Sequence, residues 1–102
     1  MSLHAQLQRR AAEKRPIRIG LIGAGKFGSM YLAQIPRTPG VHLVGIADLS
    51  PDGARRNLAR VGWSDAQTRA ASLDAAIKSG TTHIGDDWQA LVAHPAVDVV
   101  VE

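Results

Sequence analysis

The residues of this chain best suited to chemistry are three closely spaced glycines and one later aspartate. The glycines follow the pattern G-x-G-x-x-G, in a segment made of Gly23, Ala24, Gly25, Lys26, Phe27 and Gly28. This segment directly follows an apolar, β-branched run and precedes a helical pattern, and Asp48 ends the next apolar run twenty residues after Gly28. A glycine pattern in that context predicts a dinucleotide-binding site.

Each residue has a mechanical part in that prediction. Gly23 allows the tight turn out of the strand, Gly25 lets the backbone approach a pyrophosphate closely, and Gly28 lets the helix pack against the strand. The pyrophosphate would lie at the helix N-terminus, where free backbone N–H groups and the positive end of the helix dipole stabilise it. Lys26 either reaches a phosphate or is solvated at the helix start. Asp48 accepts hydrogen bonds from the hydroxyls of the adenosine ribose.

Two other interpretations of these glycines stand beside that one. The first is a glycine-rich turn that holds no ligand. The second is the phosphate loop G-x-x-x-x-G-K-[ST] of nucleoside triphosphatases, whose first seven positions run from Gly20 to Lys26. Its eighth position is Phe27, which has no hydroxyl to hold a magnesium ion, and Gly20 lies inside the predicted strand. Both departures count against a triphosphatase.

The remaining polar residues predict no catalytic or metal site. The chain has no cysteine, which excludes a disulfide scaffold, a thiolate zinc site and a cysteine nucleophile. Its four histidines are never spaced as H-x-x-x-H or H-E-x-x-H, so no metal ligand is assigned. No acid–base pair or nucleophile motif stands out, so no catalytic residue is assigned either. Trp63 and Trp88 are predicted to pack against a helix edge.

The elements that must position the glycines alternate between strand and helix. Strands are predicted where apolar and β-branched residues run together, at Ile17–Ile22, Val41–Ala47, Thr81–Ile84 and Val97–Val101. Helices are predicted over residues 3–15, 26–35, 51–61, 73–79 and 88–94. The expected N-caps are Ser50, Ser72 and either Asp86 or Asp87, and the expected C-terminal stops are Gly62 and Gly80.

This alternation predicts an α/β fold, a Rossmann doubly wound parallel sheet with right-handed crossovers. We expect the first strand in the centre of the sheet, with a ligand crevice at the carboxyl ends of the strands. Because the last strand also ends the sequence, we expect an incomplete sheet from the N-terminal part of a larger protein. The predicted organisation is a basic helical leader over residues 1–16 and a dinucleotide-binding domain over residues 17–102.

The positive charge of the chain gathers in the leader. The formal net charge is +3, yet residues 1–18 hold five of the twelve basic residues and one of the nine acidic ones. The rest of the chain is therefore almost neutral, and its few aromatic residues are not interleaved with basic ones, so no nucleic-acid partner is predicted. No apolar run approaches a membrane span and no signal-peptide layout is present, so we expect no membrane partner and a cytoplasmic location.

Three segments carry a resemblance to a known family. Ile19–Gly28, Gly45–Asp48 and Val97–Glu102 resemble the N-terminal domain of homoserine-dehydrogenase-like oxidoreductases. The branch with a C-terminal SAF domain, which includes enzymes similar to 1-deoxy-D-xylulose 5-phosphate reductoisomerase, is the most similar. The segment from Asp87 to Leu91, with the later Val97-Asp98, also resembles glucose–fructose oxidoreductase-like sugar dehydrogenases. Glu102, the glutamate after the valine run, favours the homoserine-dehydrogenase-like oxidoreductases, in which such a strand commonly ends in glutamate.

The resemblance implies an NAD(P)-dependent oxidoreductase of two or three domains. Its Rossmann domain holds the cofactor, and later domains supply the small-molecule substrate pocket, the catalytic residues and the contacts of a homo-oligomer. Only the glycine segment and Asp48 carry over to this chain, so the 102 residues alone are not expected to be active. A non-enzymatic Rossmann domain that senses the nucleotide is the alternative from another functional class.

The choice between NAD and NADP stays open at this point. Asp48 favours NAD, because its negative charge would face the 2′-phosphate of NADP. The next residue is Leu49, where an arginine would serve a phosphate best. Arg55 and Arg56 lie on the following helix and are candidates to reach back, although Arg56 is also expected to pair with Asp52. The resemblance to the reductoisomerase-like branch favours NADP.

Overall fold

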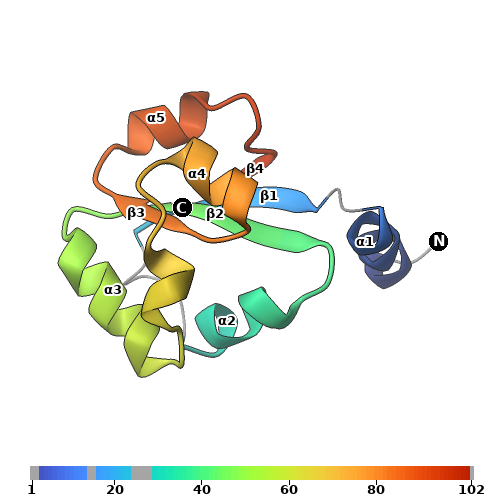
Figure 1. The fold of residues 1–102 in the computed structure, drawn as a ribbon, viewed down its shortest axis with the longest axis horizontal. Coiled ribbons are helices and arrows are strands. Elements are labelled where there is room, and N and C mark those ends of the chain that lie inside the picture. The colour runs from blue at the N-terminus through green and yellow to red at the C-terminus, as the bar shows by residue number, and fades with distance from the viewer. Residues whose placement is uncertain (1–2, 14–15, 24–28, 102) are drawn as a thin grey trace.

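Four parallel strands form the centre of the protein, in the spatial order β3-β2-β1-β4 (Figure 1). They are β1 (Ile17–Ile22), β2 (Val41–Ala47), β3 (His83–Gly85) and β4 (Val99–Val101). The computed structural model describes residues 3–13, 16–23 and 29–101. The predicted parallel neighbours are confirmed: β1 is central and pairs with β2 on one side and β4 on the other. This is the order expected of a Rossmann sheet.

Helices cover both faces of this sheet (Figure 1). On one face lie α2 (Ser29–Gln34), the short 3-10 helix η2 (Ile35–Arg37) and α3 (Pro51–Arg60). On the other lie α4 (Leu73–Ser79) and α5 (Trp88–Ala93). The α/β doubly wound prediction is therefore confirmed, because the sheet carries helices on both sides.

The helix α1 (Leu3–Ala12) lies beside the amino end of β1, apart from the sheet (Figure 1). It ends three residues before the predicted end at residue 15, in a turn where the amide of Glu13 donates to the carbonyl of Arg9. None of the helices within the described ranges is long and apolar enough to cross a membrane.

The predicted helix caps are present in the structure. The side chains of Ser50 and Ser72 accept hydrogen bonds from the amides of Gly53 and Ala75, at 3.2 and 3.1 Å. Asp87, rather than Asp86, caps α5 by accepting from the amide of Ala90 at 3.0 Å. Gly80 ends α4 in the left-handed conformation that glycine favours, with φ 75°. These local signals set the bounds of α3, α4 and α5 close to the predicted ones.

Two predicted strands begin two residues late. The amide of Thr82 donates to Gln67 and its hydroxyl donates to Leu43, so this residue is held outside the regular ladder of β3. Its partner Gln67 belongs to a 3-10 helix, η3 (Asp65–Thr68), for which the sequence analysis predicted no element. At the other edge, the amide of Val97 turns back to the carbonyl of His94, and the ladder of β4 starts after it.

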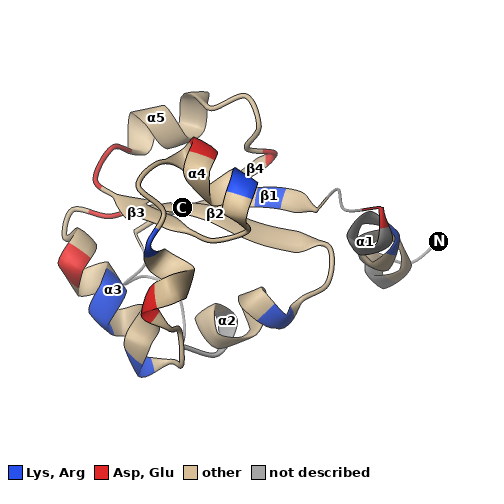
Figure 2. Ribbon diagram, in the orientation of Figure 1, with Lys and Arg blue, Asp and Glu red and all other residues tan. Residues whose placement is uncertain are grey.

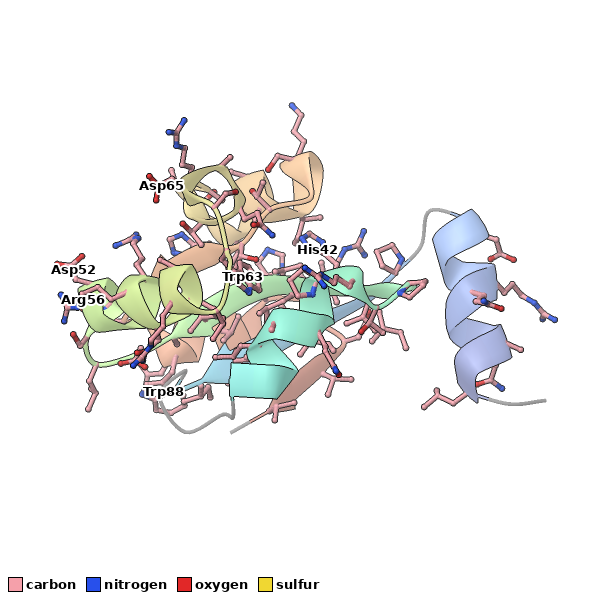
Figure 3. All side chains as sticks on the ribbon, turned by 90° about the horizontal axis from the view of Figure 1, so that it is seen from below. His42, Asp52, Arg56, Trp63, Asp65 and Trp88 are labelled. Atoms are coloured by element: carbon pink, nitrogen blue, oxygen red, sulfur yellow. The ribbon has the colours of Figure 1, made fainter. Side chains whose placement is uncertain are left out.

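The main core lies between the sheet and the α2–α3 side. Leu21 of β1, Leu43 and Ile46 of β2, and Leu58 of α3 are among its buried members. Trp63 also belongs to it, 8% exposed, and its indole N–H donates to the carbonyl of Leu32 at 2.8 Å (Figure 3). The sequence predicts that Trp63 packs against a helix edge, and in the structure its indole contacts α2 from within this core.

The register between β1 and β2 shifts by one residue in mid-strand. Ile19 lies opposite Leu43, but Gly20 lies opposite Gly45, so Val44 is an extra residue in β2. An extra residue reverses the alternation of side chains beyond it. Leu43 and Ile46, three positions apart, consequently point into the same core, although regular alternation would place them on opposite faces.

Candidate functional site

The carboxyl ends of β1, β2 and β3 are joined by backbone hydrogen bonds. The amide of Gly23, just after β1, donates to the carbonyl of Ala47 at 2.8 Å. The amide of Asp48, just after β2, donates to the carbonyl of Gly85 at 2.8 Å. Gly23 and Asp48, which the sequence analysis predicted as parts of one site, therefore lie at adjacent strand ends on the same edge of the sheet.

Gly23 has the backbone conformation that its predicted role requires. Its φ of 83° lies in the region that residues with a side chain rarely adopt. The other predicted loop residues, Ala24, Gly25, Lys26, Phe27 and Gly28, lie outside the described residues, so their roles stay predictions. The chain runs from the strand end at Ile22 to the start of α2 at Ser29, which is the strand-to-helix context that the glycine pattern needs.

A cavity of about 290 Å³ opens at this edge. Its lining consists of Ile22, Gly23, Ala47, Asp48, Leu49, Asp86 and Trp88. Leu49 is 99% exposed and Trp88 is 52% exposed, so two of the lining residues present large apolar side chains to solvent. Figure 3 labels Trp88. Exposed apolar surface beside a cavity is typical of a binding site for a flat, partly apolar ligand. The sequence predicts that Trp88 packs against a helix edge, but this first residue of α5 is half exposed beside the cavity.

The carboxylate of Asp48 is held in place by the turn that follows β2. Its Oδ1 accepts a hydrogen bond from the amide of Ser50 at 2.9 Å, and Ser50 in turn caps α3. Among the described residues, none donates to Oδ2, which leaves that oxygen available to a ligand. A fixed carboxylate with a free acceptor oxygen beside an apolar cavity suits a pair of vicinal hydroxyls.

No arginine or lysine among the described residues lines this cavity, whereas two carboxylates do, those of Asp48 and Asp86. Arg55 is turned to other partners: its guanidinium lies 3.3 Å from Asp52 Oδ1 and also donates to the carbonyl of Ile84 at 3.5 Å. The expected pairing of Asp52 with Arg56 was therefore wrong, because Arg55, one residue nearer along the chain, takes that contact. The cavity has an acidic character on its described walls.

A second cavity of about 410 Å³ adjoins the first on the α4–α5 side and shares Ala47 and Asp86 with it. Its walls include Ser72, His83 and Leu91. The ring of His83 is oriented by a hydrogen bond from Nδ1 to the carbonyl of Ala70 at 2.9 Å. Within the described ranges, no group of three or more histidine, aspartate or glutamate side chains is placed to hold a metal ion. The two cavities together extend across the carboxyl edge of the sheet.

The sequence analysis singled out Asp48 at this edge but assigned no ligand contact to Asp86 or Trp88, which line the same cavity. Asp86 and Trp88 follow the third parallel strand as directly as Asp48 follows the second. Residues just beyond the carboxyl ends of parallel strands line the crevice of such sheets, and that position was the available signal.

Comparison with known protein families gives a match that covers most of the chain. The family model GFO/IDH/MocA, described as an oxidoreductase family with an NAD-binding Rossmann fold, matches residues 17–101. The match includes all four strands and the glycine segment, and it leaves out α1. Comparison with curated proteins gives no significant match.

Proposed function

We propose, from the premise that the chain belongs to the GFO/IDH/MocA family of NAD-binding oxidoreductases, that its carboxyl edge binds the adenosine half of NAD. The observation that carries this proposal is the cavity between Asp48 and Trp88, beside the positive-φ glycine that ends β1. A volume of about 290 Å³ suits one half of a dinucleotide rather than the whole molecule. The residues present therefore fit the cofactor.

Each wall of the cavity has a part in this proposal. Asp48 accepts the ribose hydroxyls, with Oδ1 fixed by Ser50 and Oδ2 available. Trp88 and Leu49 cover the apolar faces of the adenine ring, since their exposed side chains gain burial when a flat ring lies against them. Gly23 lets the chain turn away without a side chain above the ligand. The loop at residues 24–28 is expected to hold the pyrophosphate.

NAD rather than NADP is the cofactor that these walls favour. The 2′-phosphate of NADP would enter an environment with two carboxylates and, among the described residues, no cation. Like charges at close range repel, and the repulsion grows where the walls are apolar. Arg55 would have to leave both Asp52 and the carbonyl of Ile84 to reach such a phosphate. These observations support NAD in our proposal, although the resemblance to the reductoisomerase-like branch favours NADP.

The proposed activity is that of an oxidoreductase in which this domain positions the cofactor. A bound nicotinamide cofactor supplies hydride transfer to or from a small-molecule substrate. The described residues orient the adenosine end, and none of them is assigned to catalysis. The family match favours the glucose–fructose oxidoreductase-like sugar dehydrogenases over the homoserine-dehydrogenase-like or reductoisomerase-like enzymes. Substrate-binding domains, homo-oligomeric contacts and a cytoplasmic location remain expectations for the whole protein.

The test is the affinity of Asp48 variants for both cofactors, measured by calorimetry. Asp48→Ala removes hydrogen bonds to a charged acceptor, so we expect NAD to bind about tenfold more weakly or worse. Asp48→Asn keeps an acceptor for the amide of Ser50 but loses the charge, so it should bind NADP better than the native chain does. Asp65→Ala removes an equal charge from η3, away from the cavity, and serves as the matched control.

Three results decide between the alternatives. Unchanged NAD affinity in Asp48→Ala would overturn the role of this carboxylate. If Asp65→Ala weakened NAD binding as much as Asp48→Ala does, the loss of affinity would come from the change in net charge and not from a contact with Asp48. A folded native chain that binds neither cofactor would refute both the oxidoreductase and the nucleotide-sensor hypotheses.

A further inference from the structure

A larger cavity opens at the opposite edge of the sheet, where the amino ends of β1 and β2 meet the end of α4. Its volume is about 550 Å³, within the range of small-molecule sites. Its lining includes Arg18 of β1, His42 of β2 and Lys78 of α4. This edge is remote from the crevice at the carboxyl ends, and the proposed cofactor site uses none of these residues.

The charged side chains on the walls of this cavity are all cationic. Arg18 and Lys78 line it, and no aspartate or glutamate is among its lining residues in the described part of the chain. Arg18 comes from β1 and Lys78 from the last turn of α4, so two different elements each bring one positive charge to this cavity; Figure 2 marks the basic positions of the ribbon in blue. The nearest acid by contact is Asp98, but its carboxylate accepts from the backbone amide of Arg18, at 2.9 Å, and not from the guanidinium.

The guanidinium of Arg18 has an unsatisfied donor. Its Nε is buried and has no hydrogen-bond partner among the described residues. A buried donor without an acceptor costs free energy and calls for an explanation, such as a ligand that supplies the acceptor. Arg18 thus lines the cavity, and within the described ranges no acceptor is observed for its guanidinium.

Several other polar groups of the wall are already engaged within the protein, while Gln67 adds an amide whose Oε1 accepts from the backbone of Ser64. The hydroxyl of Thr82 donates to the carbonyl of Leu43 at 2.6 Å, and that of Ser79 donates to the carbonyl of Ala75 at 2.8 Å. The ring of His42 is fixed by a hydrogen bond from Nε2 to the carbonyl of Thr81 at 2.7 Å (Figure 3). The donors left for a ligand are therefore dominated by the two cations.

The end of α4 brings partial negative charge to the same region, but its effect is small. The carbonyl of Ala76 already accepts from the amides of Gly80 and Thr81, and the carbonyl of Ala75 accepts from Ser79. A helix end carries about half an elementary charge, which two full positive charges exceed. The cavity is consequently suited to an anion.

We propose that this amino-edge cavity binds a small phosphate ester. A guanidinium and an ammonium together match a dianionic phosphate, because arginine offers a planar fork of donors and lysine a point charge. The cavity is larger than one phosphate needs, and Val41, Trp63 and Ile77 give it apolar walls for the organic part of the ester. The chain would then hold a second site, separate from the carboxyl-edge crevice.

The test uses glycerol 3-phosphate, inorganic phosphate and glycerol at constant ionic strength, with backbone amide signals of the chain followed by NMR. We expect glycerol 3-phosphate to shift the signals of Arg18, Lys78 and Thr82 in a saturable way, more tightly than inorganic phosphate does, and glycerol to shift none of them. Non-saturable shifts, or shifts confined to Gly23 and its neighbours, would overturn the proposal. Equal affinity for the ester and inorganic phosphate would overturn the part assigned to the apolar walls.

Matched variants separate a built site from general attraction to a basic chain. Lys78→Gln should weaken binding of the ester about tenfold, whereas Arg69→Gln, an exposed cation that does not line the cavity, should change it less than about twofold. Equal weakening by both variants would refute the proposal. Arg18→Met keeps the aliphatic stem, and it should abolish binding without lowering stability, because the buried Nε that it removes is unsatisfied. Affinity for NAD reports independently on the other edge and should not change in Lys78→Gln.

Discussion

A methyl group added at Gly20 tests how α5 is seated on the sheet. A Cβ at this position would lie 2.8 Å from both Cγ and Cδ1 of Leu91 and 3.0 Å from Cδ2. Leu91 is 2% exposed and has a second glycine beneath it, since a Cβ at Gly45 would lie 2.8 Å from the same Cδ1. The leucine therefore fills a hollow that two glycines leave open, and its side chain or α5 must shift to admit a methyl group there.

The size of the effect follows from two opposing terms. Overpacking a well-filled core costs about 1–3 kcal/mol. Replacing a strand glycine by alanine returns about 0.5–1 kcal/mol, because the unfolded chain loses conformational freedom. We therefore expect Gly20→Ala to lower the free energy of unfolding by about 1–2 kcal/mol. Because α5 also carries Trp88, the variant should bind NAD more weakly than the native chain.

The assay is urea unfolding followed by the fluorescence of the buried Trp63, in a double-mutant cycle with Leu91→Ala. Leu91→Ala alone should cost about 2–5 kcal/mol, because it leaves a cavity. In the double variant the new methyl occupies part of that cavity, so the combined loss should fall short of the sum by about 1 kcal/mol or more. Strict additivity would refute the proposed contact, and an unchanged stability in Gly20→Ala would refute the packing argument itself.

Two further predictions concern groups with a single defined partner. Trp63→Phe should lower the free energy of unfolding by about 1–3 kcal/mol, because the buried carbonyl of Leu32 loses the indole donor. Urea unfolding followed by circular dichroism measures this loss, and an unchanged unfolding midpoint would contradict the role of the indole. Ser72→Ala should cost about 1 kcal/mol through loss of the α4 cap, whereas Ser72→Asp should retain most of the stability; equal losses in both would argue against capping.

The parts of the fold that depend on local chemistry could be predicted from the sequence. α4 has the predicted bounds because Ser72 and Gly80 act on the backbone within one turn of it. The bounds of β1 and β2 could also be predicted, since Pro16 directly precedes the apolar run of β1 and Asp48 directly follows that of β2. Such signals need no knowledge of what the segment packs against.

The parts that depend on distant contacts could not be predicted. Thr82 lies outside the β3 ladder because its amide donates to the carbonyl of Gln67 in η3. The residues next to Thr82 in the sequence do not indicate that contact. Trp63 and Trp88 have the same residue type, yet one is 8% exposed in the core and the other is 52% exposed at a cavity rim. Which of the two is buried depends on the elements packed around each, and the residue type alone does not give this. Asp48 could be singled out because it is an acid directly after a strand, whereas the apolar walls beside it carry no such chemical signal.

The extra residue in β2, Val44, reverses which face of the sheet the alternating side chains occupy. Before Val44, His42 lies opposite Arg18 and lines the amino-edge cavity beside α4. Beyond Val44 the alternation is inverted, so the side chain of Ile46 lies in the α2–α3 core. Asp48, two residues later, follows the strand on the same face as Ile46. In an unbroken strand His42, Ile46 and Asp48 would all share one face. Because of this single inserted residue, even-numbered residues at the start of β2 and even-numbered residues at its end lie on opposite faces of the sheet. His42 at the amino edge and Asp48 at the carboxyl edge therefore lie on different faces.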